Sequence, residues 1–271
     1  MIWILTLLEP LLLVLAAPLL AGWLKWLKCH LQNRRAPSLL QPYRELAKLF
    51  RKTPVVSERA SWLFEAAPYV LFVSVFLAAA VTPSLAALLP TASIADAIVL
   101  VGSLGLGRFF LVLAGMDIGT SFGGMGSSRE ATIGSLGEPA MLMAVFALSM
   151  GAHTTNLASA IDYVLDTGLA LRTSFLFALR ALTLVAVAET GRVPVDNPTT
   201  HLELTMIHEA MILEYSGRHL ALIEWASELR LMLYGILIAN IFLPWGIAEN
   251  LDLASLCWAR VFSASSWGCW R

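Results

Sequence analysis

The sequence predicts an all-α membrane protein: a polytopic bundle of transmembrane helices with amphipathic helices on the cytoplasmic side. Three observations favour this fold class. The 271 residues are 58% hydrophobic, and their mean hydropathy of +0.74 lies far above that of a soluble domain. Several apolar segments approach the roughly 20 residues that are needed to cross a bilayer. Finally, Lys and Arg are distributed unevenly between the loops that connect these segments.

Six membrane spans are predicted from the apolar segments, at Ile2–Leu24, Ala66–Leu89, Ile94–Ala114, Glu138–Ala152, Leu169–Ala188 and Leu220–Ile247. The first lacks a basic start and a small-residue cleavage site, so we expect a retained span rather than a removed signal peptide. The first loop carries Lys25, Lys28, Arg34, Arg35, Arg44, Lys48, Arg51, Lys52 and Arg59, whereas the second and fourth loops carry neither Lys nor Arg. Because positive loops stay in the cytoplasm, odd loops are predicted to be cytoplasmic and the N-terminus to lie outside.

Composition narrows the functional classes. A net charge of −1 argues against a nucleic-acid-binding surface. The three cysteines, Cys29, Cys257 and Cys269, have no CxxC spacing, so we expect free thiols and no iron–sulfur or zinc site. His208-Glu209 begins a zinc-protease pattern, but Ile212 stands where its second histidine would be. No cofactor is therefore predicted for this chain, and any redox centre would belong to a partner.

The segment Glu189–Gly217 is dense in ionisable residues and lies between two long apolar segments. Charge in or against a bilayer is costly, so such a segment is a candidate functional site. Pro194 and Pro198 end the preceding helix, and Thr199 or Thr200 can cap a short helix that is predicted from about His201 to Tyr215 and ends near Gly217. Glu203 and Glu214 would then share one face of that helix. The alternative is a solvated surface helix.

Two other cytoplasmic segments have the character of contact surfaces. Gln41–Phe50 places Leu46, Leu49 and Phe50 at helical spacing, which predicts a basic amphipathic helix, either an interfacial anchor or a docking element. Gly115–Glu130 is rich in glycine, and we expect a flexible loop that a soluble partner approaches closely.

Charged residues also occur within or at the ends of predicted spans: Arg108, Glu138, Arg172, Arg180, Glu224, Glu228 and Arg230. One interpretation is a set of structural buried ion pairs. The other is a hydrated charged path, which their occurrence in several spans near the cytoplasmic half favours.

Two stretches of the sequence resemble the fifth-helix loop of the membrane subunit 1 family of respiratory complex I. They are Ala188-Glu189-Thr190-Gly191-Arg192-Val193-Pro194-Val195-Asp196 and, later, Glu214-Tyr215-Ser216-Gly217. Asp196–Met211 and Gly124–Glu130 resemble more closely the homologous subunit of energy-converting NiFe hydrogenases of the formate hydrogenlyase or hydrogenase-4 type. Asn197–His201 departs from complex I, whose members carry several acids there. The resemblance covers about Leu7 to Gly246 and implies a membrane-spanning ion-translocation and docking domain over 1–250. Residues 251–271 form an atypical tail, which suggests a truncated or frame-shifted end.

The resemblance implies a non-redox subunit of the inner (plasma) membrane that anchors a soluble hydrogenase arm and couples electron transfer to proton or sodium translocation. NiFe and iron–sulfur clusters would lie on the hydrogenase large and small subunits, and antiporter-like subunits would be membrane partners. The implied ion-translocation residues are Glu138, Glu189, Asp196, Glu203, Glu209, Glu214, Glu224 and Glu228. Arg192, Arg172 and Arg180 would tune their charge, and Gln41, Pro42, Glu45, Lys48, Gly126 and Arg129 would dock the partner.

Two alternatives remain beside this interpretation. A quinone-binding subunit of an NADH or ferredoxin dehydrogenase would need a hydrophobic crevice between the first span and the fifth loop. A purely structural anchor would make the acids individually dispensable.

Overall fold

The computed structural model describes residues 2–83, 96–160, 173–193, 195–196 and 206–242, and over these ranges the chain is helical, as predicted. One isolated antiparallel bridge, Asp96 with Asn156, is the only strand-like pairing within them. The long helices are α1 (Ile2–Leu31), α3 (Trp62–Val81), α4 (Ala97–Asp117), α5 (Ser121–Ala152), α7 (Thr173–Glu189) and α10 (Gly217–Phe242). Two shorter helices are α2 (Gln41–Phe50) and α9 (His208–Ile212).

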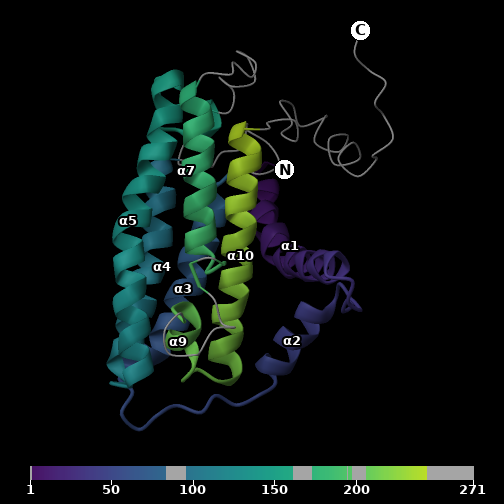
Figure 1. Ribbon diagram of the computed structural model, residues 1–271, viewed down its shortest axis with the longest axis vertical. Helices are drawn as coiled ribbons and strands as arrows, with labels where there is room; N and C mark the ends of the chain where they lie inside the picture. The colour runs from purple at the N-terminus through teal and green to yellow at the C-terminus, as the bar shows by residue number, and fades with distance from the viewer. Residues whose placement is uncertain (1, 84–95, 161–172, 194, 197–205, 243–271) are drawn as a thin grey trace.

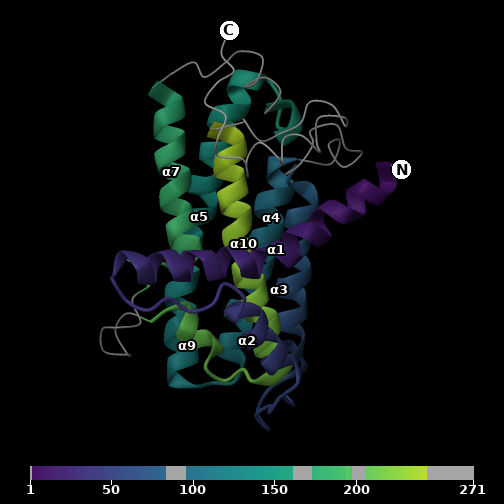
Figure 2. The ribbon, with the colours of Figure 1, turned by 90° about the vertical axis from the view of Figure 1, so that its right-hand side faces the viewer.

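Five long helices, α3, α4, α5, α7 and α10, run side by side along the long axis of the molecule (Figure 1). The first helix, α1, crosses this bundle obliquely beside α10, while α2 and α9 lie at one end (Figure 2). Two hydrogen bonds hold the crossing: Trp225 Nε1 of α10 donates to Val14 O over 2.9 Å, and Tyr43 Oη of α2 donates to Leu15 O. These contacts place α1, α2 and α10 around a common space.

The bundle is packed by apolar side chains and also presents apolar side chains outward. Leu71, Leu100, Leu182 and Ile223 are among the fully buried residues. Large apolar residues such as Leu11, Val73, Phe109, Phe177 and Leu184 are exposed, which suits a surface in contact with lipid. Among the described residues, three helices are long and apolar enough to cross a membrane: Leu8–Leu31, Trp62–Val81 and Ala97–Asp117. The described parts of the other three predicted spans lie in α5, α7 and α10, so the predicted membrane helix bundle is confirmed as a fold class.

The predicted Gly-rich loop Gly115–Glu130 is wrong, because most of it is helical. Only three residues separate α4 from α5, and Thr120 caps α5 by accepting a hydrogen bond from Gly123 N over 3.3 Å. A Cβ added at Gly126 would lie 2.9 Å from Ile207 O, so this glycine permits close packing of α5 against the segment before α9. Gly126, and likewise Gly115 of α4, therefore serve close packing rather than loop flexibility.

The segment predicted as one short helix from His201 is described only from Met206 onward, where α9 occupies His208–Ile212. Its end is a correction: Gly217 does not end that helix but begins α10, with a left-handed φ of +55°.

The sequence Tyr215-Ser216-Gly217 fastens the loop between α2 and α3, and the first turn of α3, to the start of α10. The Tyr215 ring stacks on Phe64 with centroids 4.0 Å apart, and its hydroxyl donates to Phe64 O over 3.0 Å. The Ser216 hydroxyl accepts from Val55 N over 2.7 Å and donates to Val55 O over 3.1 Å. A Cβ on Gly217 would meet the backbone of residues 52–54 at 2.8–2.9 Å, so only glycine fits at this position. We call these contacts the Tyr215–Gly217 clamp.

A charged cluster and two cavities as the candidate functional site

Arg108 of α4 is buried inside the bundle, with only 4% of its surface exposed, and is surrounded by three carboxylates. Its Nη2 contacts Glu189 Oε2 of α7, and its Nε lies 3.5 Å from Glu130 Oε1 of α5. Its Nη1 lies 3.5 Å from Glu138 Oε1, also of α5. A second buried cation, Arg230 of α10, is near enough for its charge to act on Arg108. We call Arg108, Glu130, Glu138 and Glu189 the Arg108 cluster.

Glycines on the facing helices make room for these charged side chains. A Cβ at Gly134 of α5 would lie 2.7 Å from Arg108 Nη1. A Cβ at Gly105 of α4 would lie 2.9 Å from Glu138 Oε1. These two approaches are closer than van der Waals contact allows, so a side chain at either position would displace the tip of Arg108 or Glu138.

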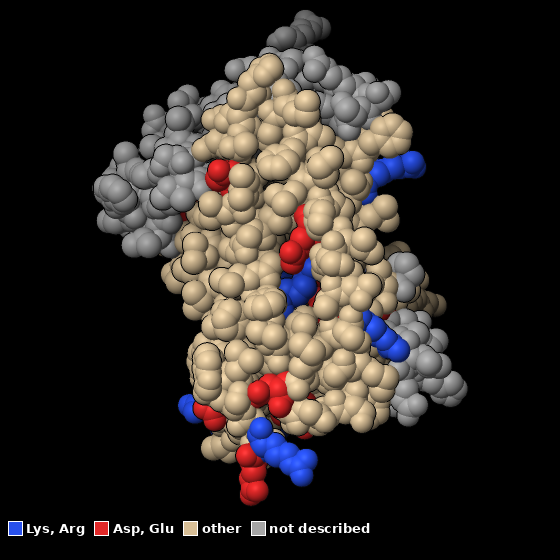
Figure 3. Space-filling model, turned by 90° about the vertical axis from the view of Figure 1, so that its left-hand side faces the viewer, with Lys and Arg blue, Asp and Glu red and all other residues tan. Residues whose placement is uncertain are grey.

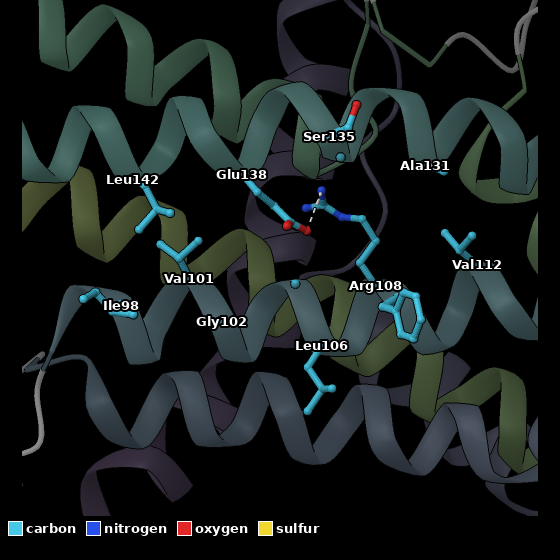
Figure 4. Close-up of a pocket in the computed structure, with 13 residues that line it drawn as sticks. Ile98, Val101, Gly102, Leu106, Arg108, Val112, Ala131, Ser135, Glu138 and Leu142 are labelled. Carbon is cyan, nitrogen blue, oxygen red and sulfur yellow. Dashed lines mark ion pairs between the residues drawn. The ribbon is translucent and has the colours of Figure 1, made fainter.

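One side of the Arg108 cluster opens into a cavity of about 620 Å³ between α4 and α5, which we call the α4–α5 cleft. Its walls are apolar, and Arg108 and Glu138 face each other inside it (Figure 4). On this face of the molecule, acidic and basic side chains show within a central hollow, and further charged side chains gather at the lower end of the view (Figure 3). The Glu138 side chain is 41% exposed, whereas that of Glu189 is 2% exposed. Glu138 is therefore the member of the cluster that the cleft exposes most.

A second cavity, of about 460 Å³, lies among α1, α2, α10 and the segments on either side of residues 197–205, and we call it the α1–α10 cavity. Part of its wall is apolar, with Ala21, Leu24, Leu46 and Leu231. The charged or titratable residues of the wall are Lys25, Lys28, Glu45, Arg192, Asp196, His208, Glu209, Glu224 and Glu228. The cavity lies where a quinone crevice would need to be, and its wall combines apolar with charged side chains.

Asp196 and His208 join the two segments that border residues 197–205. Asp196 is 4% exposed, and its Oδ2 accepts a hydrogen bond from His208 N over 3.1 Å. Burial, and secondly the charge of Arg230, lower the pKa of His208 from 6.5 to about 4. The imidazole is therefore neutral near pH 7, and Asp196 is held by the backbone amide of His208 rather than by a histidine cation.

The structure brings most of the predicted acids to these two places. Glu138 and Glu189 belong to the Arg108 cluster, and Asp196, Glu209, Glu224 and Glu228 line the α1–α10 cavity. Glu214 is exposed and lines neither cavity. Glu203 lies outside the described residues.

The predicted charge-tuning and docking residues are more scattered. Arg192 borders the α1–α10 cavity, Arg180 is exposed on α7, and Arg172 lies outside the described residues. On α2, Gln41 Nε2 donates to Glu45 Oε1 over 3.0 Å, Pro42 and Glu45 line the α1–α10 cavity, and Lys48 is exposed. Gly126 is buried, and Arg129 Nη1 donates to Met206 O over 3.4 Å, so both contact this chain itself.

Sequence reasoning placed Arg108 and Arg230 in a possible charged path without assigning them partners, and it gave no site role to Glu130 or His208 individually. Glu130 falls in the stretch expected to be a flexible loop, and α5 instead places it 3.5 Å from Arg108. Arg230 lies near Glu224 and Glu228 in the sequence, but its charge acts on Arg108 and His208. The available signal was Arg108 itself, an arginine flanked by Gly105 and Gly107 inside the third predicted span.

Comparisons with known proteins agree with this architecture. The sequence model of the NADH dehydrogenase family matches residues 2–268. The chain is 30% identical over 257 residues to formate hydrogenlyase subunit 4 of Escherichia coli (strain K12), covering 95% of this chain and 83% of that protein. It is 33% identical over 248 residues to hydrogenase-4 component C of the same organism, covering 92% and 78%.

A more distant match extends the likeness to a further respiratory complex. A chain of the membrane-bound sulfane sulfur reductase, an archaeal respiratory membrane complex, shares the fold with a TM-score of 0.81 at 17% identity, covering 96% of this chain and 85% of that one. The matched length, together with charged residues buried in an apolar helix bundle, shows that this chain is a membrane subunit of the NADH dehydrogenase family, the family of complex I subunit 1.

Proposed function

We propose that this protein is a non-redox membrane subunit that anchors the soluble arm of a hydrogenase complex and couples its electron transfer to ion translocation. The observation that carries the proposal is the Arg108 cluster, three carboxylates around one cation inside a largely apolar bundle. Charges in such a place cost free energy and are functional candidates by default. The relatives named as subunits of formate hydrogenlyase and hydrogenase-4 support the hydrogenase assignment.

The two cavities suggest the direction of the ion path. Acids of the α1–α10 cavity, which opens beside the cytoplasmic helix α2, would collect the ion. Asp196 and the Arg108 cluster would carry it across the bundle, and Glu138 would present it at the α4–α5 cleft. A carboxylate exchanges protons readily, so the proton is the ion that this set of residues fits best, with sodium as the other candidate.

The partners of the protein would occupy two surfaces. A soluble arm carrying NiFe and iron–sulfur centres would dock at the end of the bundle that bears α2, where Leu40, Phe50, Val55 and Trp62 are exposed. An antiporter-like membrane subunit would cover the α4–α5 cleft, because a half-exposed carboxylate facing lipid is costly. A photo-cross-linker at Lys48 should capture a soluble subunit, and one at Phe109 should capture a membrane subunit. The reverse pattern would contradict this assignment.

We propose that the protein lies in the inner (plasma) membrane, with the N-terminus outside and α2 in the cytoplasm, because Lys and Arg are concentrated in the odd loops. Cysteines introduced at Lys48 and at Ser159, which is exposed near the opposite end of the bundle, should be labelled from opposite sides. Labelling of both from one side would refute the topology. Ser93, in the predicted second loop, lies outside the described residues and would serve as an additional position.

The central test is the removal of titrating groups without a change of shape. Glu138→Gln and Glu189→Gln should leave the complex assembled and lower ion translocation per electron at least about tenfold. A tenfold loss of rate corresponds to an increase of about 1.4 kcal/mol in the activation free energy. Glu203→Gln belongs in the same series because the sequence assigns Glu203 the same role. Glu214→Gln is the matched control, since Glu214 is exposed and away from both cavities. Variants that all assemble and translocate ions like the parent would favour the structural anchor. Repeating the assay with and without sodium identifies the ion.

A quinone-binding function is the second candidate, because the α1–α10 cavity lies between α1 and the loop after α7 and has an apolar side. A photoreactive ubiquinone or menaquinone analogue decides this point. Saturable labelling of Leu24 or Leu231 that unlabelled quinone prevents would support a quinone site. Labelling confined to exposed lipid-facing residues would support the hydrogenase assignment.

A further inference from the structure

A third cavity, of about 10 Å³, lies between the Arg108 cluster and the α1–α10 cavity. Its polar lining consists of Glu130, Glu189, Asp196 and His208. Asp196 and His208 also line the α1–α10 cavity, while Glu130 and Glu189 belong to the Arg108 cluster. The small cavity is therefore located in the wall that separates the two sites.

One oxygen of this cavity needs a partner. Asp196 Oδ1 is buried and has no hydrogen-bond partner within the described part of the chain, although Oδ2 accepts from His208 N. Leaving a buried carboxylate oxygen without a donor is costly. A volume of about 10 Å³ holds one water molecule, provided that two to four polar groups surround it, as they do at this place. The described residues include no group of three or more His, Cys, Asp or Glu that could hold a metal ion, so water fits better than a cation.

We infer that one water molecule occupies this cavity, donates hydrogen bonds to Asp196 Oδ1 and Glu130, and connects the two sites. This inference rests on the proposed ion-translocating function. It gives Glu130 a role in the path, as the carboxylate that receives the proton on the cluster side.

The transfer through this water is balanced in protons and bonds. When Asp196 is protonated, the water turns so that it accepts a hydrogen bond from the Asp196 hydroxyl and still donates one to Glu130. Asp196 then gives its proton to the water oxygen while the water gives one of its own hydrogens to the Glu130 carboxylate. One O–H bond breaks on Asp196 and one on the water, and one O–H bond forms on the water and one on Glu130. The water is unchanged, and one proton has moved from Asp196 to Glu130.

Glu130 is a better acceptor than Glu189 on geometric grounds. Glu189 Oε2 is in direct contact with Arg108 Nη2, and its side chain is almost fully buried. Glu130 Oε1 is 3.5 Å from Arg108 Nε, and that Nε makes no hydrogen bond among the described residues. The charges of Glu130 and Asp196 also act on each other, as expected of carboxylates on opposite sides of one small cavity.

The first test is structural and is independent of activity. A high-resolution map of the assembled complex in lipid should show one density within hydrogen-bonding distance of Asp196 Oδ1 and Glu130. An empty cavity would overturn the inference. A density with several oxygen ligands at about 2.4 Å would identify a cation and would also overturn it.

The second test fills the cavity without changing any charge. Ala188 lines the cavity, so Ala188→Val should expel the water and lower ion translocation about tenfold, a change equivalent to 1.4 kcal/mol. Ala181→Val is the control on the same helix, since Ala181 does not line this cavity. Glu130→Gln should lower ion translocation as much as Ala188→Val. If the complex does not assemble with Ala188→Val, Glu130→Gln and the map together test whether the water connects the two sites.

These outcomes separate the inference from the proposed function. If Glu138→Gln and Glu189→Gln impair translocation but Ala188→Val and Glu130→Gln do not, the water link is wrong and the function stands. If none of the four variants affects translocation, the proposed function itself is wrong.

Discussion

Replacing Arg108 by glutamine removes the only described cation that contacts all three carboxylates of the Arg108 cluster. Glu138 is 41% exposed and can be solvated through the cleft, but Glu189 is 2% exposed and cannot. An isolated buried carboxylate is so costly that the group takes up a proton instead. For a glutamate that titrates near pH 4.3, binding a proton at pH 7.3 costs about 4 kcal/mol. The expected loss in unfolding free energy for Arg108→Gln is therefore about 3–5 kcal/mol, as for other broken buried pairs.

This penalty should depend on pH with a defined sign. The folded Arg108→Gln protein carries one proton more than its unfolded chain, so its stability falls as pH rises. Relative to the parent, the loss should shrink by about 1.4 kcal/mol when the pH is lowered by one unit from 7.3. Combining Arg108→Gln with Glu189→Gln removes the buried charge as well, so the double variant should be more stable than Arg108→Gln alone.

Reversible unfolding in mixed detergent micelles, followed by circular dichroism at pH 7.3 and 6.3, measures these free energies. Arg180→Gln is the matched control, because Arg180 is exposed on α7, and it should change the unfolding free energy by less than about 0.5 kcal/mol. A loss below about 1 kcal/mol for Arg108→Gln, or an equal loss at both pH values, would refute the reasoning that Arg108 neutralises buried charge.

Three further predictions concern packing, titration and the clamp. Gly134→Ala places a Cβ 2.7 Å from Arg108 Nη1 and should destabilise the protein by about 1–3 kcal/mol in the same assay. In Gly124→Ala the added Cβ meets nothing within 4 Å, so this control should stabilise α5 by up to about 1 kcal/mol. Equal effects of the two variants would contradict the packing argument. The pKa of His208 is lowered from 6.5 to about 4, so between these pH values the unfolded chain binds more protons than the folded protein. The unfolding free energy should therefore fall as the pH drops from 6.5 to about 4, and His208→Gln should remove this fall. A pH profile of stability that His208→Gln leaves unchanged would contradict this role of His208. Ser216→Ala removes two hydrogen bonds to the first loop and should cost about 1–3 kcal/mol, with faster protease cleavage of that loop; unchanged cleavage rates would show that the clamp does not hold it.

The sequence predicted the helix bundle because hydropathy is a local property that each span shows by itself. Glu138 and Glu189 were identified for a related reason, since a charge beside an apolar segment is visible without knowledge of its neighbours. Their common partner was not identified. Arg108, Glu138 and Glu189 belong to three different helices, and only the packing of α4, α5 and α7 brings them together.

Glycine explains the main error in secondary structure. The same residue type favours flexible turns and close helix packing, so the run from Gly115 to Gly126 is compatible with both. Thr120 carries the deciding information, as the N-cap of α5, but a single threonine is a weak signal within a glycine-rich run. An expected loop over this run also makes Glu130 a solvent-exposed residue, which hides its pairing with Arg108.

The spacing of the two α5 carboxylates also determines how the cluster responds to a membrane potential. Glu130 and Glu138 are eight residues apart on one continuous helix, which separates them by about 12 Å along its axis. With α5 along the membrane normal, as its alignment with the long axis of the bundle suggests (Figure 1), this distance is about 40% of a 30 Å hydrocarbon layer. Moving one elementary charge between them would cross the same share of the potential, about 0.9 kcal/mol at 100 mV. Proton transfer past Arg108 would then be an electrogenic step, and the potential that the complex builds would oppose it.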